Sequence, residues 1–257
     1  MRLNLRAIEE HLETEFVGRR IVYLTSTGST QDVARVEAEA GAPAGTTVVA
    51  EEQTAGRGRF GRSWVSPAGK NLYLTLLMRP PLERLRSLSI VAPLAVALAV
   101  EEMTGLRPQL KWPNDVLINE RKLSGILVES ELSGRSVNYA LVGIGVNVNF
   151  DIEEAPEIAG IATSLKRELG RETARERLLA TLLNRFEALY EDAAQDRNVV
   201  QQWRSRLGML GRHVKVTFRD QVEEGLAEDV DSDGNLILVQ ADSRRILIEG
   251  GEVTLRE

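Results

Sequence analysis

Residues 116–148 read VLINERKLSGILVESELSGRSVNYALVGIGVNV, and this stretch decides the fold. It predicts three consecutive strands over Val116–Ile118, Leu123–Glu131 and Val137–Val148, joined by hairpin links. Consecutive strands joined in this way are antiparallel. Helices and strands precede them in mixed order without a strict βαβ alternation, so the sequence predicts an α+β domain with a mixed or antiparallel sheet.

The flanking segments complete this domain and add a second one. Periodicity predicts, in order, the elements Leu5–Phe16 (helix), Ile21–Leu24 (strand), Gln31–Ala40 (helix), Thr46–Ala50 and Leu72–Met78 (strands), Ser87–Met103 (helix) and a long amphipathic helix around 178–190. From Gly211 onward, five short strands alternate with tight polar turns, of which DSDGN at 231–235 is the strongest. We therefore expect a main domain over 1–210 and a small antiparallel barrel over 211–257.

Composition narrows the chemistry. The 257 residues carry 32 Lys and Arg against 38 Asp and Glu, a net charge of −6, which argues against a general nucleic-acid coat protein. There is no cysteine, which excludes disulfides, thiolate nucleophiles and cysteine zinc sites. The two histidines, His11 and His213, lie too far apart in sequence to suggest a metal cluster or a catalytic triad. Any catalysis or ligand binding must therefore depend on arginine, lysine, carboxylate and amide side chains and on backbone groups.

No segment looks like a targeting or membrane signal. The first 16 residues are charged and amphipathic, without the apolar core of a secretory signal. The longest apolar run, Ile90–Val100, is about half of the roughly 20 residues that a bilayer span needs, and it contains Pro93. We expect a buried helix there, a cytoplasmic protein, and no membrane partner.

The most unusual motif is GRGRFGR at 56–62. It matches the dinucleotide fingerprint G-x-G-x-x-G, but Pro67 and Gly69 leave no room for the helix that must follow. The glycines instead allow backbone N–H groups to turn toward an anion, and the three arginines suit a carboxylate or phosphate. The alternative is an ordinary solvated loop.

Two further motifs carry charge. In KWPND, at 111–115, Asp115 is a candidate partner for Mg²⁺ if the ligand includes phosphate; the alternative is a turn with a buried tryptophan. In RKLSGILVE, at 121–129, Lys122 enters an apolar strand and can face a negative ligand. Its alternative is an exposed lysine at a hairpin.

Two more motifs indicate a function only weakly when each is considered alone. The glycines of GIGVNVN, at 143–149, weaken a strand and mark close approach by a backbone or ligand, while Asn147 and Asn149 share a face. The hydroxyl-rich turn STGSTQ, at 26–31, is by itself an ordinary helix cap.

Taken in this order, the motifs resemble the biotin protein ligase family. The resemblance rests on Gln53 with the GRGRFGR loop and Trp64, then on KWPND, RKLSGILVE and GIGVNVN, and it covers roughly 26–149. It implies a class II synthetase-like catalytic domain followed by an SH3-like barrel. It also implies a reaction in which the carboxylate of biotin attacks the α-phosphate of ATP, with Mg²⁺, to give biotinyl-5′-AMP and pyrophosphate. The biotinyl group then passes to one lysine of a biotin carboxyl carrier protein.

The family pattern also implies roles for individual residues. Biotin and the adenylate are expected at Ser29, Thr30, Gln31, Gln53, Arg57, Gly58, Arg59, Lys122, Gly125 and Gly143. Arg59 and Lys122 are expected to contact the carboxylate–phosphate junction, and Asp115 to hold Mg²⁺ or deprotonate the acceptor lysine. Asn114 and Asn147, with Trp64 and Trp112 as packing walls, are expected on the nucleotide side.

Some features depart from the family or leave alternatives open. Gln31 stands where the family often has asparagine, and Phe60 where many members have a charged residue. The hydroxyl turn begins at Ser26, which leaves no room for a helix-turn-helix, so we expect a ligase without nucleic-acid binding. A homodimer is possible, with Val137–Val148 as its candidate edge. The alternatives are a lipoate- or octanoate-protein ligase or transferase of the same fold, and a non-catalytic biotin sensor.

Overall fold

The computed structural model describes residues 2–195, 197–218 and 221–255. Seven strands form the main sheet: β1 (Ile21–Leu24), β2 (Thr47–Ala50), β3 (Leu72–Met78), β4 (Gln109–Lys111), β5 (Asp115–Ile118), β6 (Arg121–Ser133) and β7 (Ser136–Val146). Their order is β1-β2-β3-β7-β6-β5-β4, and the β1–β2 pair alone is parallel. The sheet is therefore mixed, as the sequence predicts.

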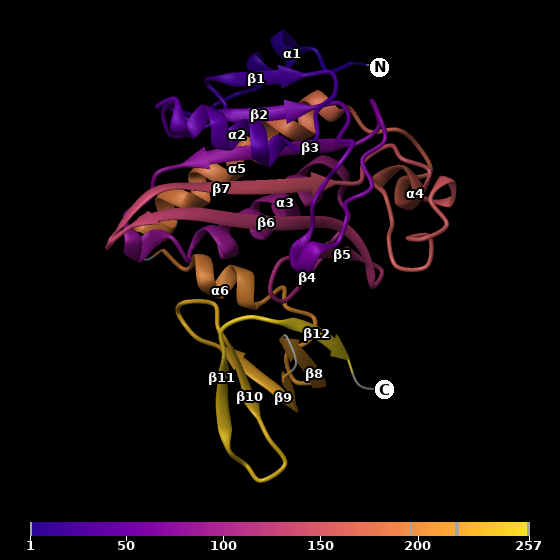
Figure 1. The fold of residues 1–257 in the computed structure, drawn as a ribbon. Helices are drawn as coiled ribbons and strands as arrows, with labels where there is room; N and C mark the ends of the chain where they lie inside the picture. The colour runs from indigo at the N-terminus through magenta and orange to yellow at the C-terminus, as the bar shows by residue number, and fades with distance from the viewer. Residues whose placement is uncertain (1, 196, 219–220, 256–257) are drawn as a thin grey trace.

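Helices cover both faces of this sheet (Figure 1). The core on one face contains α3 (Leu88–Thr104) and α5 (Arg175–Ala194), with α1 (Leu5–Glu9) packed against α5. On the other face α2 (Thr30–Glu39) packs over β2, β3 and β7. Alternate residues of β7 serve the two faces, since Val142 belongs to the α3 core and Leu141 to the α2 core. No helix in the described residues is both long and apolar enough to cross a bilayer.

The C-terminal residues form a second, five-stranded antiparallel sheet. It consists of β8 (His213–Phe218), β9 (Gln221–Val230), β10 (Leu236–Val239), β11 (Arg245–Ile248) and β12 (Glu252–Leu255), in the order β11-β10-β9-β8-β12. The short helices α4 (Leu165–Leu169) and α6 (Val199–Arg204) lie in the connections before it. Trp112 joins the two sheets, because its Nε1 donates to the carbonyl of Gly234 at 2.8 Å. The predicted α+β class with a small terminal β domain is confirmed.

Two sequence-based expectations are wrong. The helix predicted over Leu5–Phe16 ends at Glu9, and the chain is then drawn to α5, where the Glu187 carboxylate accepts the N–H groups of Phe16 and Val17 at 3.0 and 2.7 Å. The strand predicted over Val137–Val148 ends at Val146 and offers no sheet edge, because β3 and β6 flank it on its two sides. Residues 140–146 of this strand are thus unavailable for extending the sheet into a dimer, and the homodimer itself stays a prediction.

A buried ion pair fixes the start of the chain to α5. Glu51 and Arg175 are 4% and 5% exposed, and Arg175 Nη1 lies 2.8 Å from Glu51 Oε2. The hydroxyl of Tyr23 donates to the same carboxylate at 2.8 Å. Burial alone would raise the pKa of Glu51, but hydrogen bonds from Leu3, Arg175 and Tyr23 hold that pKa below its ordinary value.

We predict that Glu51→Gln lowers the free energy of unfolding by about 3–5 kcal/mol at neutral pH, because the negative charge facing a buried guanidinium is lost. Since the folded-state pKa is lowered, the carboxylate's contribution is complete above the unfolded value of about 4.3 and is lost as the pH falls through the folded value. Urea unfolding of both proteins across pH 7 to 3 measures this. If the difference in unfolding free energy between wild type and Glu51→Gln does not become smaller as the pH falls, the stabilising role given to the Glu51 carboxylate is wrong.

Candidate functional site

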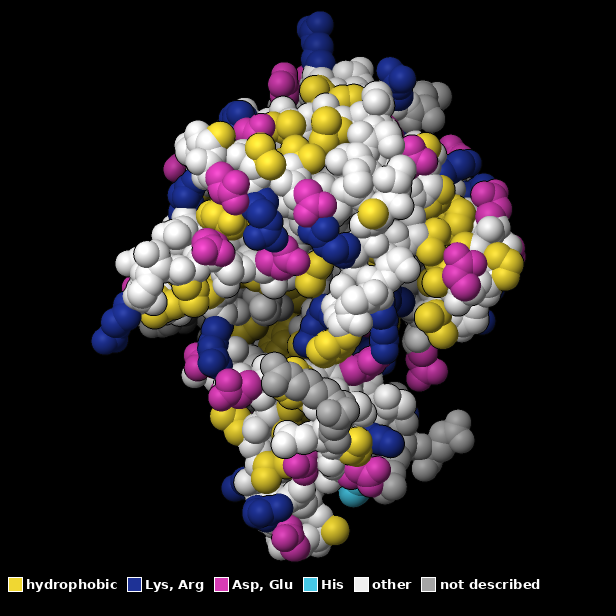
Figure 2. Space-filling view, in the orientation of Figure 1, with side chains coloured by type: hydrophobic (Ala, Val, Ile, Leu, Met, Phe, Trp, Pro, Cys, Tyr) yellow, Lys and Arg dark blue, Asp and Glu magenta, His cyan; other side chains and the backbone are white. Residues whose placement is uncertain are grey.

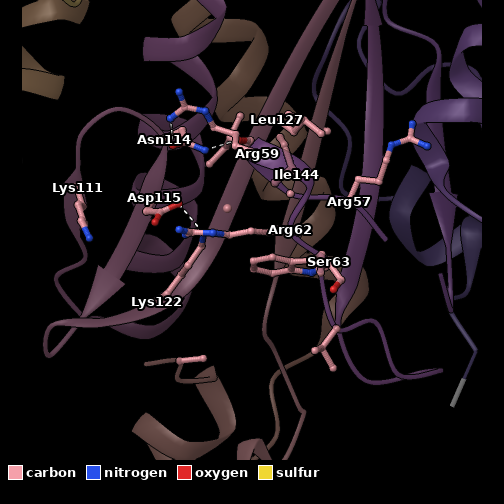
Figure 3. Close-up of a pocket in the computed structure, with 18 of the residues that line it drawn as sticks. Arg57, Arg59, Arg62, Ser63, Lys111, Asn114, Asp115, Lys122, Leu127 and Ile144 are labelled. Atoms are coloured by element: carbon pink, nitrogen blue, oxygen red, sulfur yellow. Dashed lines mark hydrogen bonds and ion pairs between the residues drawn. The ribbon is translucent and has the colours of Figure 1, made fainter. Parts of the chain in front are cut away.

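One cavity of about 470 Å³ is lined by every residue to which the sequence analysis gave a binding or catalytic role. It opens at the ends of β6 and β7, on the face that carries α2, and the loop of residues 56–65 crosses it (Figure 3). Its lining includes Ser29, Thr30, Gln31, Gln53, Arg57, Gly58, Arg59, Trp64, Trp112, Asn114, Asp115, Lys122, Gly125, Gly143 and Asn147. Residues from five separate motifs therefore meet at one place.

Three glycines form the floor of the cavity. Gly125 and Gly145 are register partners on β6 and β7, and Gly143 lies two residues from Gly145 on the same face. A Cβ atom on Gly145 would lie 2.5 Å from the indole of Trp64, and one on Gly143 would lie 3.0 Å from Gln31 Nε2. The missing side chains let Trp64 and Gln31 lie directly on the sheet.

We predict that Gly145→Ala pushes Trp64 off the floor and raises the Kd of the ligand by about tenfold or more, the usual cost of overpacking. Gly28→Ala is the matched control, because a Cβ atom there meets nothing within 4 Å. Wild-type ligand binding by Gly145→Ala would show that Trp64 does not need contact with this glycine. Calorimetric titration with the ligand measures both variants.

The start of α2 supplies the uncharged polar groups of the cavity. Ser29 caps this helix by accepting the N–H of Gln31, and Thr30 donates its N–H to Gln53 Oε1 at 2.9 Å. Gln31 donates through Nε2 to the carbonyl of Leu127 at 3.1 Å. Within the described part of the chain, Gln31 Oε1 and Trp64 Nε1 are buried without a hydrogen-bond partner. Because buried polar atoms are normally satisfied, this acceptor and this donor are suited to a ligand.

The three arginines of the loop take different directions. Arg57 pairs with Asp32 on α2 through two hydrogen bonds of 2.9 and 2.7 Å, and in Figure 3 it points away from Arg59. Arg62 pairs with Glu252 of the C-terminal sheet. Arg59 donates to Asn114 Oδ1 at 3.0 Å and to the carbonyl of Gly251 at 3.1 Å.

The surroundings of Arg57, Asp32 and Arg59 shift the pKa values of their side chains. The hydrogen bonds with Asp32 raise the pKa of Arg57, and the same contact holds the pKa of Asp32 below its ordinary value. Burial lowers the pKa of Arg59, which faces no carboxylate at hydrogen-bond distance within the described chain. Arg59 is therefore the loop arginine whose charge is best placed to meet an anion.

Lys122 and Asp115 form the second charged element. They lie on the neighbouring strands β6 and β5, with Lys122 Nζ 2.7 Å from Asp115 Oδ1 (Figure 3). The ammonium also lies 5.5 Å from the centre of the Trp64 ring. Lys122 is held at both its backbone groups, since its N–H donates to Ile161 and its carbonyl accepts from Thr163. The cationic end of the cavity is thus fixed by the sheet.

The described residues contain no cluster of three or more His, Cys, Asp or Glu that could hold a metal ion alone. Three carboxylates line the cavity, those of Asp115, Glu120 and Glu252, and Glu252 pairs with Arg62. Asp115 suits Mg²⁺, since this ion keeps several waters and takes its other ligands from phosphates. The donor set fits a metal that arrives with a nucleotide.

Some selected residues also have structural roles. Trp112 is 2% exposed and ties the two sheets together, and Asn147 donates to the carbonyl of Thr163 at 3.0 Å. The sequence analysis missed Ile161 and Glu252, which also line the cavity. Ile161 is 67% exposed at the rim, where a flat ring can cover it. Neither residue carries a local signal, because tertiary folding alone brings these two segments to the motifs.

Comparisons with known proteins identify relatives over nearly the whole chain. A model described as "Biotin/lipoate A/B protein ligase family" matches residues 23–147, and one described as "Biotin protein ligase C terminal domain" matches residues 209–256. The bifunctional ligase/repressor BirA of Bacillus subtilis is 36% identical over 88% of this chain and 71% of its own length. The biotin–[acetyl-CoA-carboxylase] ligase of Mycobacterium tuberculosis is 33% identical over 95% and 94%. Among solved structures, the biotin protein ligase of Aquifex aeolicus in complex with biotin and ATP matches with a TM-score of 0.80 and 33% identity, over 93% and 99%.

Proposed function

This chain belongs to the biotin protein ligase family, and from that premise we propose that its cavity joins biotin to ATP as biotinyl-5′-AMP and passes the biotinyl group to a lysine of a carrier protein. The observation that carries the proposal is the division of one cavity into an uncharged end and a cationic end. A ligand with a small apolar ring system and a carboxylate needs both.

The uncharged end is suited to the ring of biotin. Gly125, Gly143 and Gly145 leave a flat floor, and Trp64 lies against it. The buried Gln31 Oε1 can accept an N–H group of the ring, and Trp64 Nε1 can donate to an oxygen or sulfur. We assign the ring to this end, where binding satisfies two polar atoms that are otherwise left without partners.

The cationic end is suited to the carboxylate and the α-phosphate. These two groups repel each other, so adenylate formation depends on holding them in line and neutralising their charge. We assign this role to Lys122 and Arg59, which the sheet and Asn114 hold in place. Asp115 would hold Mg²⁺ with the phosphates, and the ion would neutralise part of their charge. No nucleophile of the protein is needed, because the carboxylate of biotin itself attacks.

The substrate class is tested by offering biotin, lipoate or octanoate with Mg-ATP and measuring pyrophosphate release and the acyl adenylate. With Mg-ATP present, we expect pyrophosphate release with biotin and none with lipoate or octanoate. The glycine floor and the two unpartnered polar atoms, Gln31 Oε1 and Trp64 Nε1, match a compact polar ring. Release with lipoate or octanoate, and none with biotin, would place the protein with the ligases of those acids. Binding of biotin without any adenylate would support a non-catalytic sensor.

A further inference from the structure

A second recess lies on the far side of Arg59 from the ligand cavity. Its volume is about 260 Å³, and it is bounded by the start of α3, by β6 and by the C-terminal loops at 233–235 and 249–250. Six residues line both this recess and the ligand cavity: Arg59, Trp112, Pro113, Asn114, Ile126 and Leu127. The 3.0 Å hydrogen bond between Arg59 and Asn114 therefore forms part of the boundary. Figure 2 shows the molecule hollowed at the waist between the two sheets.

The recess changes in character from its rim to its interior. At the rim, Arg86 lies 3.5 Å from Glu249 and 3.8 Å from Asp233, which leaves two carboxylates against one guanidinium. The inner wall is apolar, with Ile126 and Trp203 both almost fully buried. The two carboxylates at the rim can attract an ammonium group, and the apolar wall suits a methylene stem, while Arg59 at the inner boundary brings the charged lining to two arginines and two carboxylates.

We propose that this recess is the route by which the acceptor lysine reaches the adenylate, an inference that rests on the function proposed above. At that stage biotin and AMP would occupy the ligand cavity, and the loop that carries Trp64 lines it. The recess reaches the Arg59–Asn114 boundary from the side of α3 and the C-terminal loops.

The chemistry of the transfer fits this path. The lysine enters as an ammonium, and the apolar wall disfavours its charged form, so that a proton is lost to water. The neutral amine attacks the carbonyl carbon of the mixed anhydride, the C–N bond forms, and the bond from that carbon to the phosphate oxygen breaks. AMP leaves with the electron pair, and the second proton of the former ammonium goes to water.

Ser89→Trp tests the route by filling the recess. Ser89 lies in the first turn of α3, is exposed, and lines this recess but not the ligand cavity, so the change does not disturb the core. We expect biotin-dependent adenylate synthesis within about twofold of wild type, and transfer to a biotin carrier domain slowed about tenfold or more, a cost typical of misplacing a reacting group. Hydroxylamine, a small nucleophile, should discharge the adenylate at the wild-type rate.

Ser133→Trp is the matched control, because it makes the same change at an exposed position on β6 that lines neither cavity. Transfer by Ser89→Trp at the rate of this control would overturn the route. A parallel loss of adenylate synthesis in Ser89→Trp would overturn it too, and would assign the recess to ATP or pyrophosphate. Wild-type protein that makes no adenylate would instead refute the underlying ligase function.

Discussion

Replacing Lys122 with methionine is expected to slow biotinyl-5′-AMP synthesis by about 100- to 1,000-fold, the usual effect of removing a fixed group that stabilises developing charge. Methionine keeps the length of the stem beside Trp64 but removes the ammonium. Asp115 then faces the two reacting anions without its 2.7 Å partner, which adds repulsion where the wild type has attraction. Pyrophosphate release at saturating biotin and ATP measures the loss in kcat.

Lys70→Met is the matched control, since Lys70 lines neither of the two cavities and the substitution is the same. It should keep wild-type activity. Thermal unfolding distinguishes a loss of catalysis from a loss of folded protein. We expect Lys122→Met to stay folded, because Asp115 and Lys122 are both partly exposed and water can solvate the remaining carboxylate. Wild-type kcat in folded Lys122→Met would contradict the role given to this ammonium.

Arg59→Ala is expected to lose adenylate synthesis far more than it loses stability. The side chain links the loop to Asn114 and to the carbonyl of Gly251, and its guanidinium lies 4.8 Å from the centre of the Phe60 ring. Its removal takes away the cation and one contact of the loop with the C-terminal residues, while the Arg62–Glu252 pair remains, so we expect a decrease in kcat/KM of about 100-fold or more. The free energy of unfolding should change by about 1 kcal/mol, as for one or two exchanged hydrogen bonds.

Arg245→Ala provides the comparison for Arg59→Ala, since it removes an exposed arginine that pairs with Glu228 on the C-terminal sheet. Its activity should match wild type. If Arg59→Ala unfolds but retains full activity per folded molecule, Arg59 has a structural role and the assignment to the reacting anions is wrong. Activity and urea unfolding must therefore be measured on the same preparations.

The fold was most predictable where local pattern and tertiary structure agree. β3 occupies Leu72–Met78 as predicted, because a run of β-forming residues is buried on both faces and Pro80 follows it. The hairpin from β5 to β6 also agrees with the prediction, since Asn119 and Glu120 adopt the positive φ angles of a two-residue turn. In both places, local sequence alone carries enough information.

The remainder depended on contacts between distant segments. The helical stripe of Leu5–Phe16 stops at Glu9 because Glu187, on α5, binds the backbone of the residues that follow. Similarly, no local motif predicts the partners of the loop arginines. Arg59 donates to the carbonyl of Gly251, 192 residues away, and Arg62 forms an ion pair with Glu252. The resemblance selected Arg59 and Lys122 for the reacting anions, but no local pattern indicated that Asp32 pairs with Arg57 or that Glu252 pairs with Arg62.

A chase experiment tests the central claim most directly. The protein is loaded with biotin and α-labelled Mg-ATP, freed of excess nucleotide, and mixed with a biotin carrier domain. We predict that biotinyl-5′-AMP accumulates on the protein and then disappears at the rate at which AMP is released and the carrier gains biotin, mole for mole. Biotin and ATP that bind without forming this intermediate, or a carrier that stays unmodified as the adenylate decays, would contradict the account.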